Sequence, residues 1–140
     1  MRTTMDRTTP HNALIYIMIT MSAADRKITD SELTRITEII RQVPVFRDYD
    51  LDHLVKAVEA CGNILGEEDG LHTLLELIAG SLPRKLHETA YVLALEVAAA
   101  DLCVPQEEVR LLELLADELR LDKLVTAALE RAAKARHQTI

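Results

Sequence analysis

Apolar residues recur along the chain at the three- and four-residue spacing of helices, and few glycines or prolines interrupt them. Two segments, residues 12–24 and the central part of 84–100, are apolar on almost every side, which is typical of buried helices. Amphipathic segments follow them at 30–43 and 105–119, and other helices are expected near 51–65, 71–80 and 123–136. The pattern predicts an all-α fold, a compact bundle of about seven helices with the two apolar helices back to back at its centre.

Helix ends carry local signals of their own. Thr29 and Glu32 form a capping-box sequence, in which each side chain bonds the backbone amide of the other residue. Pro44 should end the second helix, Asp50 or Asp52 should begin the third, and Asp122 should begin the last. Two apolar faces are expected to point to the core: Leu51, Leu54, Val55, Val58 and Cys61 in the third helix, and Leu124, Ala127, Ala128 and Leu129 in the last.

A short motif occurs twice, 76 residues apart, at 23–33 and at 99–109. Both copies begin Ala-Ala-Asp, follow an apolar helix and lead into an amphipathic one. This internal repeat predicts two related halves about a pseudo-twofold axis, with the acidic turns in related positions. It also argues against a signal peptide at the N-terminus, because the same apolar run before small residues recurs in mid-chain.

Composition narrows the class of protein. The 140 residues suit one domain, residues 10–140, preceded by a flexible arm at 1–9. The net charge of −7 argues against nucleic acid, which needs clustered Lys and Arg, and no apolar run is long enough to span a bilayer. With two cysteines at no metal-ligand spacing, a reduced, cytoplasmic setting is expected.

The repeated motif resembles the signature of the tellurite-resistance TerB-like family, over residues 12–135. In that family an Ala-Asp-Gly-x-Ile turn leading to Glu recurs in both halves of an all-helical domain. Related domains occur at the N-terminus of a membrane-attached J-domain co-chaperone. This chain has Arg26 and Leu102 where the family turn has Gly, and a β-carbon there is unfavourable if the turn needs a positive φ.

The resemblance implies a metal-oxyanion or other stress response, with acidic residues that bind divalent cations. At the matching positions those metal ligands would be Asp25, Asp30, Glu32, Asp101, Glu107 and Glu108. Hard cations take several oxygen ligands at once, and the spacing is not that of an EF-hand. The alternative is that these residues are structural, because Asp is common in turns and acidic side chains are favoured at helix N-termini.

Other residues offer little catalytic chemistry. The five histidines form no zinc or di-iron motif, and no nucleophile elbow or phosphate loop is present. Glu96 is charged within an apolar helix and must find a partner, be protonated or reach the surface; we expect an exposed stripe. We therefore expect a non-enzymatic module. The alternative function is a protein-interaction scaffold with a protein partner, as a homodimer or in a peripheral membrane complex.

Overall fold

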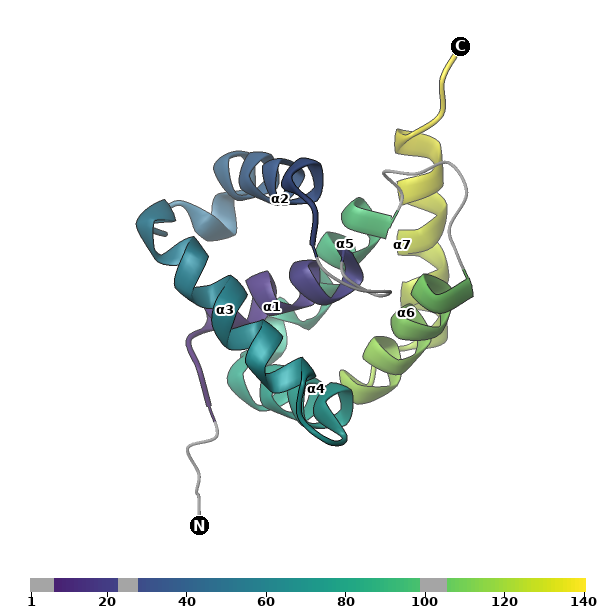
Figure 1. Cartoon of the computed structure of the whole chain (residues 1–140). Coiled ribbons are helices and arrows are strands. Elements are labelled where there is room, and N and C mark those ends of the chain that lie inside the picture. The colour runs from purple at the N-terminus through teal and green to yellow at the C-terminus, as the bar shows by residue number, and fades with distance from the viewer. Residues whose placement is uncertain (1–6, 23–27, 99–105) are drawn as a thin grey trace.

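The computed structural model describes residues 7–22, 28–98 and 106–140, and all structural statements below concern these residues. They form seven α-helices and three short 3-10 helices, without a strand (Figure 1). The all-α prediction is confirmed. The helices are α1 (Pro10–Ser22), α2 (Asp30–Gln42), η1 (Pro44–Phe46), η2 (Leu51–His53), α3 (Leu54–Leu65), α4 (Gly70–Ser81), η3 (Arg84–Leu86), α5 (His87–Ala98), α6 (Gln106–Glu118) and α7 (Lys123–Arg136).

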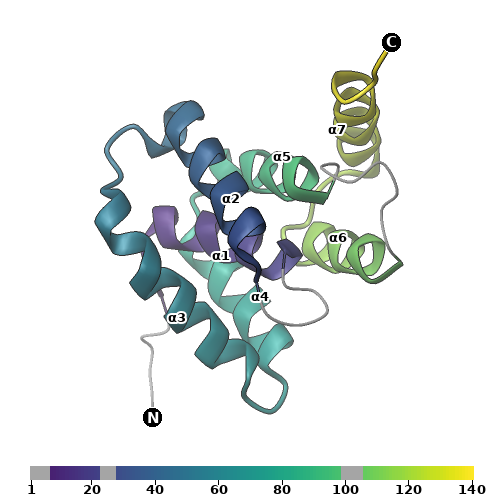
Figure 2. The ribbon, with the colours of Figure 1, turned by 45° about the horizontal axis from the view of Figure 1, so that its top comes forward.

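The two apolar helices, α1 and α5, pack against each other at the centre of the molecule, as the hydrophobic pattern predicts (Figures 1 and 2). Every side chain from Ala13 to Met21 is buried, including the hydroxyl-bearing Thr20, which donates to the Tyr16 carbonyl at 2.7 Å. Helices α2, α3 and α4 pack on α1, whereas α6 and α7 pack on α5. The central pair therefore joins the two halves of the chain.

Local signals placed most helix ends correctly. Both bonds of the capping box are present: Glu32 N donates to Thr29 Oγ1 at 3.2 Å, and Thr29 N donates to Glu32 Oε1 at 2.8 Å. Helix α2 ends before Pro44, and Asp122 caps α7 by accepting from the backbone amide of Leu124. Of the two candidate caps for the third helix, Asp50 makes the bond, but it caps the 3-10 turn that precedes α3.

Two predicted apolar faces were partly wrong. Val55 is 63% exposed, and Leu54, Ala57 and Cys61 form the buried face of α3 instead. The helix is turned about its own axis so that Val55 faces solvent. In α7, Leu124 is 80% exposed, and Ala127 and Ala128 are exposed with it. This helix packs mainly on α5, through a narrower stripe that contains Leu129 and Ala133.

The internal repeat is only partly visible. A buried helix followed by an amphipathic one occurs twice, as α1–α2 and α5–α6. Both Ala-Ala-Asp turns lie outside the described residues, so the twofold relation stays a prediction. Most of the expected N-terminal arm also lies outside them, but its end is anchored, because the backbone amide of Thr8 donates to Ser81 Oγ at 2.9 Å. No helix in the described ranges is long and apolar enough to cross a membrane.

Candidate functional site

A pocket of about 220 Å³ lies where the beginning of α2 meets the beginning of α6. Its walls come from both halves of the chain. Glu32 belongs to the first copy of the repeated motif and Glu108 to the second. The ends of α1 and α5 complete it, so that the lining residues are Met21, Ser22, Thr29, Ser31, Glu32, Arg35, Val97 and Glu108. We call this the acidic pocket.

The capping box holds Glu32 in this pocket. Its Oε1 accepts a hydrogen bond from the backbone amide of Thr29, which fixes the carboxylate over the first turn of α2. The Thr29 hydroxyl lies 3.2 Å from that of Ser31, so two hydroxyl oxygens gather beside the carboxylate. This cap bond uses only one oxygen of Glu32. The capping-box residues that begin α2 therefore also place a group of oxygen atoms at the pocket.

Charge in the acidic pocket is mixed. Glu32 and Glu108 are both half-buried, and each lies in the first turn of its helix, where the helix dipole favours negative side chains. Arg35, one turn after Glu32, brings a guanidinium to the same wall. Formally one negative charge remains on these three side chains. Sequence reasoning missed Arg35, although its spacing from Glu32 places the two on one helix face.

The other predicted ligands fall into two groups. Asp30 and Glu107 are exposed and do not line the acidic pocket. Asp25 and Asp101 lie outside the described residues. Within the part of the chain that the structure describes, no three His, Cys, Asp or Glu side chains are grouped to hold a metal ion. The pocket therefore brings together one predicted ligand from each copy, and a full ligand set would need residues beyond this pair.

We expected Glu96 to lie on an exposed stripe of its helix, and this expectation is wrong. Its side chain is only 18% exposed and pairs with Arg136 at 2.8 Å, and with His137 at 3.5 Å, at the end of α7. Burial raises the pKa of this carboxyl, but the hydrogen bond and charge of Arg136, together with His137, outweigh it and hold the pKa below its ordinary value. Glu96 is therefore a structural link between α5 and α7, and the alternative of a protonated carboxyl is wrong.

Nucleophilic chemistry finds no support at Cys61. The thiol is fully buried beneath α1, 3.8 Å from the carbonyl oxygen of Tyr16 and from the hydroxyl of Thr20. Burial raises its pKa to about 11, so the reactive thiolate is scarce at neutral pH. Cys103 lies outside the described residues. His72 and Glu76, 3.3 Å apart, are an exposed pair on α4.

Comparison with known proteins points to one family. The family model described as "Tellurite resistance protein TerB" matches residues 11–131, which is most of the chain. No curated protein and no solved structure matched the sequence. The matched range begins in α1 and ends in α7, so it includes both copies of the repeated motif and the acidic pocket between them.

Proposed function

Because this chain belongs to the TerB family, we propose that it is a non-enzymatic module of a metal-oxyanion stress response that binds a divalent cation at the acidic pocket. The observation that carries the proposal is that Glu32 and Glu108, from the two copies of one motif, line a single pocket. Hydroxyl oxygens of Thr29 and Ser31 lie beside them. An oxygen-rich set of this kind suits a hard cation such as Ca²⁺ or Mg²⁺.

Asp25 and Asp101 complete the proposed ligand set. Both precede these two helices in the sequence, and the family resemblance assigns them to the cation. Two carboxylates offset only part of the cost of removing water from a divalent ion, especially with Arg35 nearby. Additional carboxylates from the turns would supply the missing oxygens.

The test is a titration of the full chain with Ca²⁺, Mg²⁺ and Zn²⁺, followed by calorimetry and by backbone NMR. We expect saturable binding, with shifts at the first turns of α2 and α6. The double variant E32Q/E108Q should weaken it, and Gln at position 32 keeps the capping box, which accepts Glu or Gln. The matched control is E67Q/E68Q, because these exposed acidic residues precede α4, away from the pocket. Equal affinity in the two double variants would reject the site.

The role in stress response needs a cellular test. In the source organism, E32Q/E108Q should lower the tellurite concentration that arrests growth, and E67Q/E68Q should leave it unchanged. Loss of resistance in both variants at equal protein levels would disconnect the acidic pocket from the response.

One observation favours the second candidate function, a protein-interaction scaffold. Leu124 at the start of α7 is 80% exposed, and a large apolar side chain in solvent can serve as a contact at an interface. For that role L124D should abolish self-association, or capture of a cytoplasmic or peripheral membrane partner, without altering cation binding. The scaffold role would be rejected if the wild type sediments as a monomer and L124D captures the same partners as the wild type.

A further inference from the structure

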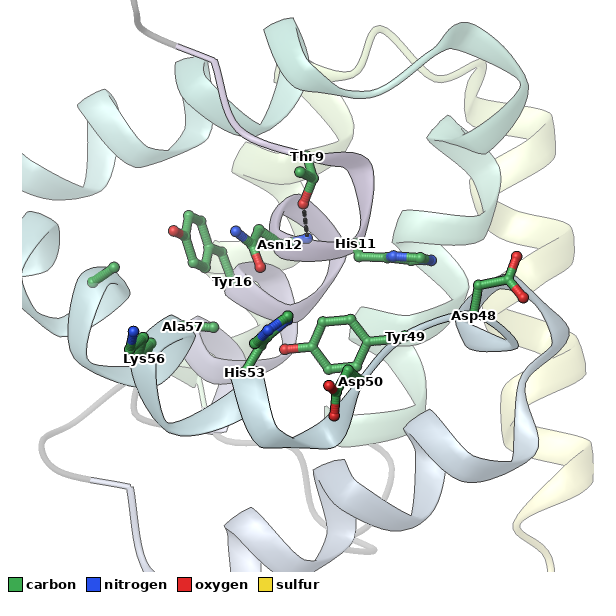
Figure 3. A pocket seen from close by; sticks show the side chains of 11 residues that line it. Thr9, His11, Asn12, Tyr16, Asp48, Tyr49, Asp50, His53, Lys56 and Ala57 are labelled. Atoms are coloured by element: carbon green, nitrogen blue, oxygen red, sulfur yellow. Dashed lines mark hydrogen bonds between the residues drawn. The ribbon is translucent and has the colours of Figure 1, made fainter.

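A second pocket, of about 450 Å³, is seen from close by in Figure 3. It lies at the opposite end of α1 from the acidic pocket. It is bounded by the first turns of α1, by the connector that holds η1 and η2, and by α3. Because α1 has 13 residues and is therefore roughly 20 Å long, the two pockets are separate. Small-molecule sites typically have volumes of roughly 300–1,000 Å³, so this pocket is large enough for a small ligand. We call it the aromatic pocket.

Aromatic rings form one wall of the aromatic pocket. The Tyr49 ring lies between those of His11 and His53, with centroid distances of 5.5 and 6.4 Å, both edge-to-face. Phe46 packs behind them. Nε2 of His11 donates to the Val45 carbonyl at 2.8 Å, which orients that ring. The His11 ring is thus oriented before any ligand arrives, and such preorganisation lowers the entropic cost of binding.

The hydroxyl of Tyr49 is buried, and no group in the described ranges bonds it. In Figure 3 it points between His53 and Ala57, toward the side of the pocket where Tyr16 lies. Leaving a buried hydroxyl without a partner costs about 1–3 kcal/mol, so few structures keep one without a reason. A ligand that carries a hydrogen-bonding group would supply the partner once it displaced the side chains that cover the hydroxyl.

Charge is divided between the two ends of the aromatic pocket. Asp48 lies on one side of Tyr49 and Lys56 on the other, with Asp50 below the ring (Figure 3). All three charged residues are exposed at the rim. A simple anion would meet the net charge of −7 of the chain as well as both carboxylates. A ligand with separated positive and negative ends has no net charge and matches both ends of the pocket.

We propose that the aromatic pocket binds a short free peptide, with its N-terminal ammonium at Asp48 and its C-terminal carboxylate at Lys56. A peptide of two or three residues separates its terminal charges by roughly 7–10 Å, because an extended residue spans about 3.5 Å, whereas both charges of a single α-amino acid sit on one carbon. A backbone amide in its middle would partner the Tyr49 hydroxyl, and an apolar or aromatic side chain would rest on the rings of Tyr49 and His53.

The probe is the tripeptide Ala-Phe-Ala with free termini, titrated into the ¹⁵N-labelled full chain. Saturable shifts should appear at backbone amides of 9–16 and 48–60, and none in α7. Three matched peptides remove the charges: the N-acetylated form, the C-terminal amide and the doubly blocked form. Each missing charge should weaken binding roughly two- to fivefold, as expected for exposed ion pairs. Absence of saturable shifts at millimolar peptide, or equal binding of the doubly blocked form, would overturn the proposal.

Variants test the contacts one at a time. Y49F removes only the unpartnered hydroxyl, so the free protein should become more stable while peptide binding falls roughly three- to tenfold. K56Q should weaken the free tripeptide but not its C-terminal amide. The control K134Q changes an exposed lysine of α7 that does not line the pocket and should change neither. Tighter binding of 6-aminohexanoate than of the tripeptide, or an unchanged affinity in Y49F, would reject a peptide as the ligand.

Discussion

The carboxylate of Glu96 accepts two hydrogen bonds from the guanidinium of Arg136, one from Nε at 2.8 Å and one from Nη2 at 3.3 Å. The two residues are 40 positions apart in the sequence. This pair joins the centre of the molecule, α5, to the end of the outer helix α7, which has no buried residue of its own. The docking of α7 therefore combines polar contacts with the apolar packing of residues such as Leu129 and Ala133.

Replacing Glu96 should loosen α7 selectively. In E96Q the Arg136 guanidinium loses its charged partner, and we expect faster amide exchange across α7 while α1 and α3 stay protected. Hydrogen exchange measured by mass spectrometry checks this. E113Q is the control, because Glu113 pairs with Arg110 at 3.4 Å within one exposed turn of α6. Equal exchange in α7 of both variants would contradict the structural link.

The same pair predicts a pH dependence of stability. The pKa of Glu96 is lowered from its ordinary value of 4.5 in the folded protein. A carboxyl with a lowered folded-state pKa contributes its full stabilisation above the unfolded-state value and loses it as pH falls through the folded-state value. The difference in unfolding free energy between wild type and E96Q should therefore be constant near neutral pH and shrink below about pH 4.5. Urea unfolding at a series of pH values measures it; a difference that grows on acidification would contradict the sign.

The capping box should contribute measurably to stability. T29A removes the hydroxyl that accepts a hydrogen bond from the Glu32 backbone amide. Loss of such a cap lowers the free energy of unfolding by about 1 kcal/mol. E32Q should cost less, since a Gln amide oxygen can accept the Thr29 amide in place of the carboxylate. Urea unfolding of the two variants compares these effects. A smaller loss in T29A than in E32Q would show that charge, and not the cap, is what matters at this helix start.

Gly70 begins α4 at a place that admits no side chain. An added β-carbon would lie 2.2 Å from the carbonyl oxygen of Ile64, so the backbone itself would have to move. We expect G70A to destabilise the protein by about 3 kcal/mol, in the upper range for overpacked sites. G80A is the matched control: nothing lies within 4 Å of that position in α4, and Ala there should stabilise the helix by about 0.5–1 kcal/mol. Thermal unfolding distinguishes the two signs.

Cys61 should react only when the protein unfolds. Its thiol is fully buried and its pKa is raised to about 11 by burial. In a C103S background, modification by a thiol reagent should be slow in buffer and complete in urea. Rapid labelling of the folded protein would show that the contact between α1 and α3 opens far more often than its packing indicates.

The sequence alone was a good guide to local structure. Apolar periodicity predicted the helices, and the residues at Thr29, Glu32, Pro44 and Asp122 predicted where helices begin or end. These predictions succeeded because helix caps and helix periods depend on residues within a few positions of each other. The repeated motif also carried the family assignment, which the family model confirmed over residues 11–131.

Only the tertiary structure decided which helix faces are buried and which distant side chains meet. Val55 and Leu124 look like core residues in sequence but point to solvent, because the rotation of a helix is set by its neighbours. Glu32 lines one pocket with Glu108, Glu96 pairs with Arg136, and Tyr49 meets His11 of α1. Such contacts join residues far apart in the chain, and they follow from how side chains interlock at helix interfaces, which periodicity does not encode.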